Sequence, residues 1–153
     1  MSIEKSVGSL IERWKREGVE IQPPVDRTTV TQSFEAVGSK APGDVVALFA
    51  LLGGMSEMDN EYWKMWSLQE IIEANQVQSN HGILFSDYCM DCYQYRLNPI
   101  SAQVSEVWVE GFDYGPPVLI ASSLADFFDA YISNPDSVLN APPSRPEYDP
   151  RNA

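Results

Sequence analysis

The spacing of apolar residues along the chain is the feature that most restricts its fold. Up to residue 54 these residues recur at helical intervals, and from 83 to 121 they form short runs separated by turn residues. A helical spacing returns between Ser123 and Ile132. Helices, then neighbouring strands, then a closing helix are typical of an α+β domain. We therefore expect a single domain whose central, mostly antiparallel sheet is flanked by helices.

Three helices are expected before residue 55. The first carries an apolar stripe from residue 3 onward and ends at Gly18. The second begins at a capping-box pattern formed by Thr29 and Gln32, and it closes at Gly38. The third is apolar on nearly all sides over residues 45–52, so it should be deeply buried.

The middle of the chain favours strands. An aromatic strand is expected at 63–66, followed by a short helix that Ser67 and Glu70 would cap. Four further strands are expected between turn signals, at residues 83–85, 92–97, 104–109 and 118–121. Ser123 and Asp126 would then cap the last helix, which Pro135 would end.

The chain length allows one full hydrophobic core. A chain of 153 residues buries roughly 70% of its extended surface on folding, which makes a second core unlikely to form. Residues 135–153 contain five of the 11 prolines and no apolar periodicity. We therefore predict one domain over residues 1–134 and a loose, proline-rich tail over 135–153.

The net charge of −12 is concentrated in the middle of the chain. Residues 44–136 carry 14 acidic residues and only two basic ones, Lys64 and Arg96, whereas the flanking segments are neutral. Nucleic acids and anionic membrane surfaces are polyanions, so neither is an expected partner. The charge instead favours a cationic protein and speeds the encounter with it, although solubility alone would also account for it.

No membrane segment is expected. The longest unbroken apolar run, over residues 45–52, is far shorter than the ~20 residues of a membrane-spanning helix. Glu4, Lys5 and Glu12 interrupt the first residues, so a secretory signal peptide is not expected either. These features predict a soluble, cytoplasmic protein.

Motifs for metal or nucleophilic chemistry are weak. Cys89 and Cys92 form a C-x-x-C pair, but a zinc site needs four ligands and His81 is the only histidine. The pair lies between two expected strands and not at a helix start, so we interpret it as structural. An EF-hand beginning at Asp59 is excluded because Lys64 would replace its glycine, which leaves only a weak surface cation site as an alternative. We predict no cofactor, no metal and no catalytic residues.

Loops that combine carboxylates with aromatic residues are the candidates for binding a protein partner. Protein-binding surfaces use rigid aromatic anchors together with charges that steer the partner. An ordinary solvated loop would look the same in sequence. The predicted partner-binding residues are Glu57, Asp59, Glu61, Tyr62, Asp87, Asp91 and Tyr93.

The order of short motifs resembles that of the SUKH superfamily over about residues 28–134. The motifs are a short helix leading through Pro42 into an apolar helix that ends Leu51-Leu52-Gly53-Gly54, then Trp66-Ser67-Leu68 with Glu70-Ile71, then Ile83-Leu84-Phe85-Ser86-Asp87 followed by Cys92-Tyr93-Gln94-Tyr95-Arg96-Leu97, and finally Ile120-Ala121-Ser122-Ser123-Leu124-Ala125-Asp126-Phe127-Phe128. The superfamily includes a yeast cell-wall (glucan) synthesis regulator and many bacterial immunity proteins of polymorphic toxin systems. Tyr88, Cys89 and Met90 stand where the superfamily usually has a glycine-rich turn.

The resemblance implies a non-catalytic α+β domain that binds another protein. Our first hypothesis is a bacterial immunity protein that neutralises a cytoplasmic toxin domain, for which the localised acidic charge suits a basic toxin such as a nuclease. The second is a regulatory scaffold like the yeast members. The third is an enzyme that uses Asp87 and Asp91, which would require a closed pocket and a carboxylate with a perturbed pKa. Self-association through an exposed edge strand is also possible.

Overall fold

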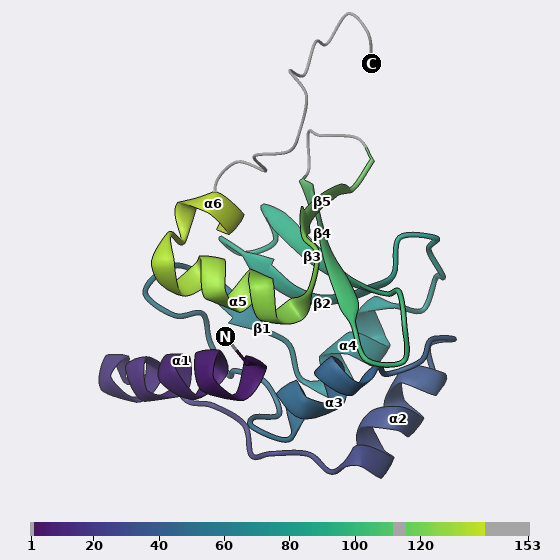
Figure 1. Ribbon diagram of the computed structural model, residues 1–153, viewed down its shortest axis with the longest axis horizontal. Helices are drawn as coiled ribbons and strands as arrows, with labels where there is room; N and C mark the ends of the chain where they lie inside the picture. Colours follow the sequence, from purple (N-terminus) through teal and green to yellow (C-terminus); the bar gives the residue numbers. More distant parts are fainter. Residues whose placement is uncertain (1, 112–115, 140–153) are drawn as a thin grey trace, which may run out of the picture.

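The computed structural model describes residues 2–111 and 116–139, and this part of the chain holds six helices and a five-stranded sheet (Figure 1). The α+β, single-domain prediction is confirmed. In chain order the elements are α1 (Ile3–Glu17), α2 (Arg27–Glu35), α3 (Gly43–Phe49), β1 (Trp63–Met65), α4 (Leu68–Ala74), β2 (Ile83–Tyr88), β3 (Tyr93–Pro99), β4 (Ser105–Gly111), β5 (Val118–Ala121), α5 (Leu124–Ser133) and α6 (Asp136–Leu139).

The sheet is a meander in which the strands lie in the order β1-β2-β3-β4-β5 and every neighbouring pair is antiparallel. One face packs against α5, which crosses it in Figure 1, and Tyr95 of β3 meets Phe127 of α5 there, with ring centroids 5.5 Å apart. Residues directly opposite each other share a face, so Lys64, Asp87 and Gln94 lie together on the other face. This division into a core face and a polar face is usual for an antiparallel sheet.

Trp63 of β1 is the centre of an aromatic cluster in the core. Its ring lies 6.0 Å from that of Trp14 on α1 and 5.4 Å from that of Tyr131 on α5, measured between centroids. Phe127 and Phe128 complete the cluster at 5.9 and 5.8 Å. Contacts of this kind add about 0.5–1.5 kcal/mol per pair beyond the area that the rings bury. The cluster thus joins α1, the sheet and α5 in one core.

A buried carboxylate, Asp59, lies at the edge of this cluster and links the same elements by hydrogen bonds. Its Oδ2 accepts the indole N–H of Trp14 at 2.8 Å and the hydroxyl of Tyr131. Its Oδ1 accepts the backbone N–H groups of Glu61 at 2.9 Å and Trp63 at 3.1 Å. The residue is 3% exposed, so these four donors satisfy a charge that water cannot reach.

Arg13 completes the surroundings of Asp59. Its Nη2 lies 3.6 Å from Asp59 Oδ2, and its guanidinium carbon is 5.2 Å from the centroid of the Tyr131 ring. Burial and the neighbouring carboxylate raise the pKa of Tyr131, so the phenol stays protonated and donates a hydrogen bond to Asp59. Asp59 is therefore the point at which α1, α5 and the loop before β1 are held together.

The outer edge of β1 is closed by the segment that precedes it. The backbone N–H of Met55 donates to the carbonyl of Met65 at 2.9 Å, and that of Asp59 donates to the carbonyl of Trp63 at 2.9 Å. The N–H of Trp63 is taken by the Asp59 side chain. Native sheets commonly protect their edges in such ways. Backbone pairing with a second chain at this edge would have to displace these bonds.

Two helix boundaries differ from the expectation for physical reasons. The second helix begins at Arg27, two residues before Thr29, because the Asp26 carboxylate caps it by accepting the Thr29 N–H at 2.8 Å. The third helix ends at Phe49 and not at residue 52, because the Phe49 carbonyl accepts the N–H of Val25, which belongs to another segment, at 2.8 Å. The capping box of Ser67 and Glu70 is confirmed.

Pro135 immediately precedes helix α6, where the sequence suggested the start of a loose tail. Its carbonyl accepts the N–H groups of Val138 at 3.1 Å and Leu139 at 3.0 Å, which closes the first turn of the helix. The hydroxyl of Tyr95 donates to the Val138 carbonyl at 2.6 Å, which fixes α6 to the sheet. The packed part of the chain therefore extends to Leu139, and the remaining residues of the expected tail, 140–153, lie outside the described residues.

Replacing Asp59 with alanine should lower the free energy of unfolding by at least about 3 kcal/mol, because four buried donors lose their acceptor. Urea denaturation followed by tryptophan fluorescence measures the change. Glu57→Ala is the matched control, since Glu57 is a nearby but exposed carboxylate, and it should change stability little. Equal losses in the two variants would contradict the central role of Asp59.

Candidate partner-binding groove

Two adjoining depressions, which together we call the acidic groove, lie on the polar face of the sheet beside β1. Their volumes are about 680 and 590 Å³, and they share Lys64, Asp87 and Met90. The first is also lined by residues of the loop before β1, namely Glu57, Met58, Asp59, Asn60 and Tyr62. The second is also lined by residues of α4 and of the β2–β3 hairpin, namely Trp66, Glu70, Glu73, Ala74, Asp91 and Gln94.

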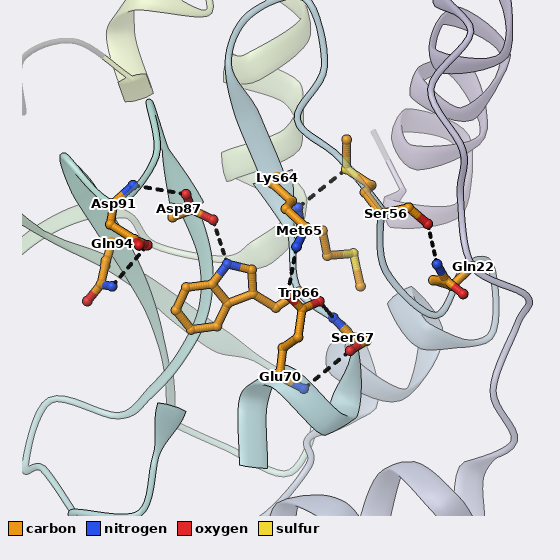
Figure 2. Close-up of polar contacts among 11 residues, drawn as sticks. Gln22, Ser56, Lys64, Met65, Trp66, Ser67, Glu70, Asp87, Asp91 and Gln94 are labelled. Atoms are coloured by element: carbon orange, nitrogen blue, oxygen red, sulfur yellow. Dashed lines mark hydrogen bonds and ion pairs between the residues drawn. The ribbon is translucent and has the colours of Figure 1, made fainter. Parts of the chain in front are cut away.

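Asp87 lines both halves of the groove, and its two carboxylate oxygens accept hydrogen bonds from Trp66 and Asp91, as Figure 2 shows. Its Oδ1 accepts the indole N–H of Trp66 at 2.5 Å, and its Oδ2 accepts the backbone N–H of Asp91 at 3.1 Å. The Asp91 carboxylate in turn accepts the side-chain amide of Gln94 at 3.3 Å. Asp87 thereby connects the end of β1 to the turn of the β2–β3 hairpin.

The electrostatics of the groove are dominated by carboxylates. Burial raises the pKa of Asp87, and the negative charge of Asp91 acts in the same direction, while the Trp66 hydrogen bond opposes both. Among the described residues, Lys64 is the one cation lining either depression, and its Nζ lies 2.6 Å from Oε2 of Glu70. Because that cation is already paired, the groove presents an excess of negative charge.

The turn of the β2–β3 hairpin has an unfavourable backbone conformation. Cys89, Met90 and Asp91 have φ angles of 55°, 54° and 72°, a left-handed region that side chains other than glycine disfavour. Tyr62, across from this turn, has φ 68°, and its carbonyl accepts the Cys89 N–H at 2.8 Å. Strained backbone of this kind is found preferentially at functional sites, where surrounding contacts hold it.

Three large apolar side chains are exposed at the groove. Met58 is 37% exposed, Tyr62 is 55% exposed and Met90 is 78% exposed, and all three line the first depression. Apolar side chains gathered at one place and surrounded by charge are typical of protein-binding surfaces. The groove therefore offers apolar anchors as well as negative charge.

Of the seven residues predicted to bind a partner, four besides Asp59 line the groove: Glu57, Tyr62 and Asp91, which are exposed, and Asp87, which is 8% exposed. Asp59 also borders the first depression, but it is 3% exposed and its oxygens accept hydrogen bonds in the core. Glu61 lines neither depression. Tyr93 shares the opposite sheet face with Tyr88, its cross-strand partner, at a ring distance of 5.9 Å.

Several groove residues were not anticipated from the sequence. Met58 and Met90 are apolar residues inside polar turn segments, which is the signal that could have marked them. Glu70 was recognised only as half of a capping box, and Glu73 lies one turn further along α4. These two glutamates extend the negative surface beyond the loops that were predicted.

An enzyme that uses Asp87 would need a carboxylate with a perturbed pKa and a closed pocket, and the groove offers the first but not the second. Asp87 has a raised pKa, as a catalytic carboxylate can, but the groove is an open depression and both Asp87 oxygens accept structural hydrogen bonds. In residues 2–111 and 116–139, no cluster of three or more His, Cys, Asp or Glu side chains could hold a metal ion. No helix in these residues is long and apolar enough to cross a membrane.

The comparisons with known proteins add no relative. No protein-family model matches the chain, and no curated protein sequence matches it. The SUKH resemblance therefore remains a prediction.

Asp87→Asn should remove one component of the pH dependence of stability. Since burial raises the pKa of Asp87 above its ordinary 3.8, the folded state favours the protonated form. Its contribution to stability is present below pH 3.8 and is lost as the pH rises through the folded-state pKa. Urea denaturation at a series of pH values should show the wild type losing stability relative to the variant across that rise. A constant difference between the two proteins would contradict the raised pKa.

Met90→Gly should stabilise the fold by about 1 kcal/mol, because glycine adopts the left-handed conformation without strain. The shift of the urea midpoint measures this. Met58→Gly is the control, since Met58 is also exposed but is not left-handed, and it should not stabilise the protein. A destabilised Met90→Gly protein would show that the methionine side chain contributes more to folding than its exposure indicates.

Proposed function

We propose that the protein is an immunity protein, which binds and neutralises a basic toxin domain, such as a nuclease, through the acidic groove. The observation that carries the proposal is the combination of exposed apolar anchors with exposed carboxylates along the groove. Met58, Tyr62 and Met90 supply the anchors, and Glu57 and Glu73 are exposed at its two ends. The SUKH resemblance supports the same reading.

The charge of the groove suits a partner whose own site is cationic. A nuclease domain attracts a polyanion, so an acidic protein surface can occupy the same site and compete with the nucleic acid. Complementary charge also raises the association rate, which matters for an inhibitor that must bind before damage occurs. Lys64 does not offset this field because Glu70 already pairs with it.

The structure of the groove also suits rapid, preformed binding. The Asp87 hydrogen bonds to Trp66 and Asp91 hold the hairpin against the end of β1. The bond from Cys89 N–H to the Tyr62 carbonyl holds the hairpin against the loop before β1. A site held in this way loses little conformational freedom when a partner binds, so more of the contact energy appears as affinity.

The double variant Glu57→Lys/Glu73→Lys should lose protection against the cognate toxin. The protein is co-expressed with the product of the adjacent gene, and growth and complex formation are measured. The wild type should rescue growth and form a complex that weakens as salt rises, because the attraction is electrostatic. The variant should bind at least about ten-fold more weakly, a change that corresponds to ~1.4 kcal/mol.

The matched control is Glu4→Lys/Glu35→Lys. It changes the net charge by the same amount at exposed positions that do not line the groove, so it should still rescue growth. Equal loss in both double variants would assign the effect to net charge and not to the groove. A harmless neighbour, or a toxic one that is neither bound nor neutralised, would overturn the immunity role and favour a regulatory scaffold.

A further inference from the structure

Two exposed cysteines occupy the ends of the β2–β3 turn. Cys89 and Cys92 are the first and last residues of the four that separate the strands, and both thiols are free. The Cys92 N–H donates to the Cys89 carbonyl at 3.4 Å, which closes the turn. A hydrogen bond between the two thiols raises the pKa of Cys92. The sulfur atoms thus lie within hydrogen-bonding reach of each other in the reduced protein.

The geometry of this turn is compatible with a bond between the sulfurs. The first and fourth residues of a β-turn have Cα atoms closer than about 7 Å, and disulfides join Cα atoms roughly 4.4–6.8 Å apart. The surrounding contacts hold the turn in this form, since Tyr88 pairs with Tyr93 and Cys89 N–H donates to the Tyr62 carbonyl. Folding has therefore already removed much of the freedom that closing the ring would remove.

The surroundings favour disulfide chemistry over metal binding. Within residues 2–111 and 116–139 no third His, Cys, Asp or Glu joins the two thiols in a metal-binding group. Both cysteines are exposed, so a small disulfide can reach either sulfur from solvent. Access to the sulfur is a condition for thiol–disulfide exchange, because the attacking thiolate must approach the disulfide directly.

We propose that Cys89 and Cys92 form a thiol–disulfide exchange site whose substrate is a small disulfide of the glutathione class. One cysteine thiolate attacks a sulfur of glutathione disulfide, breaks its S–S bond and releases one glutathione thiolate. The second cysteine thiolate then attacks the mixed disulfide at the protein sulfur and releases the second glutathione. The two protein thiols are oxidised to one disulfide, and glutathione disulfide is reduced to two glutathione molecules. The two protons that the protein thiols lose are taken up by the released thiolates.

The site is separate from whatever the acidic groove binds, although the two are adjacent. Met90, a groove residue of the β2–β3 turn that is 78% exposed, lies between the two cysteines in the sequence. The exchange reaction needs neither Met90 nor a bound protein. It can therefore be tested on the isolated chain, and its outcome is independent of the proposed immunity role.

The test incubates the full chain in buffers of defined glutathione to glutathione disulfide ratio, followed by acid quenching, alkylation and intact mass analysis. The wild type should become a species that has lost two hydrogen atoms and takes up no alkylating reagent. Excess glutathione should return it to the dithiol. Cys89→Ser and Cys92→Ser should each stop at a mixed disulfide with one glutathione, which shows that both sulfurs are needed.

A peptide spanning residues 88–93 measures what the fold contributes. If the folded turn holds the sulfurs in position, the equilibrium constant for disulfide formation should be at least about ten-fold larger in the protein than in the peptide. Equal constants would overturn the proposal, because the pair would then react as any two nearby thiols do. Accumulation of glutathione-linked or disulfide-linked dimeric wild-type protein, without the internal disulfide, would overturn it as well.

Discussion

The buried carboxylate of Asp59 is the interaction on which the arrangement of the elements depends. A charge at 3% exposure is tolerable only because four donors from α1, α5 and the backbone before β1 converge on it. Without the Asp59 carboxylate, each of these donors would in turn lose its hydrogen-bond acceptor. The same segment closes the edge of β1 and then continues into Tyr62 at the groove, so the position of the groove follows from the core contact beside it.

The two faces of the sheet differ in their side chains and in how far they are covered. The face beneath α5 is apolar and aromatic, and it supplies the packing energy of the domain through residues such as Tyr95 and Phe127. The other face carries Asp87 and Gln94 and is only partly covered, which leaves room for the groove between α4 and the β2–β3 hairpin. The core contacts and the groove therefore use different side chains of the same strands.

Local patterns in the sequence predicted the fold class and most elements, because helix caps and apolar periodicity are local properties. They could not predict the role of Asp59, whose donors Trp14 and Tyr131 are 45 and 72 positions away in the chain. Local patterns also could not show that Tyr93 lies on the sheet face opposite the groove. The expected strand at 83–85 continues to Tyr88 through a bulge between Leu84 and Ser86, and in a strand a shift of one residue reverses the face. The residues that line the groove could therefore not be identified without the β2–β3 register.

The closed edge of β1 has a consequence for selectivity. An open strand edge accepts almost any extended peptide, since backbone groups are the same in every sequence. Here Met55 and Asp59 occupy those backbone groups beside the groove. A partner at this side of the sheet must be distinguished by its side chains, through charge and shape, and promiscuous pairing is disfavoured. Under the proposed immunity role, changes at a few groove positions would let the same scaffold distinguish closely related toxins.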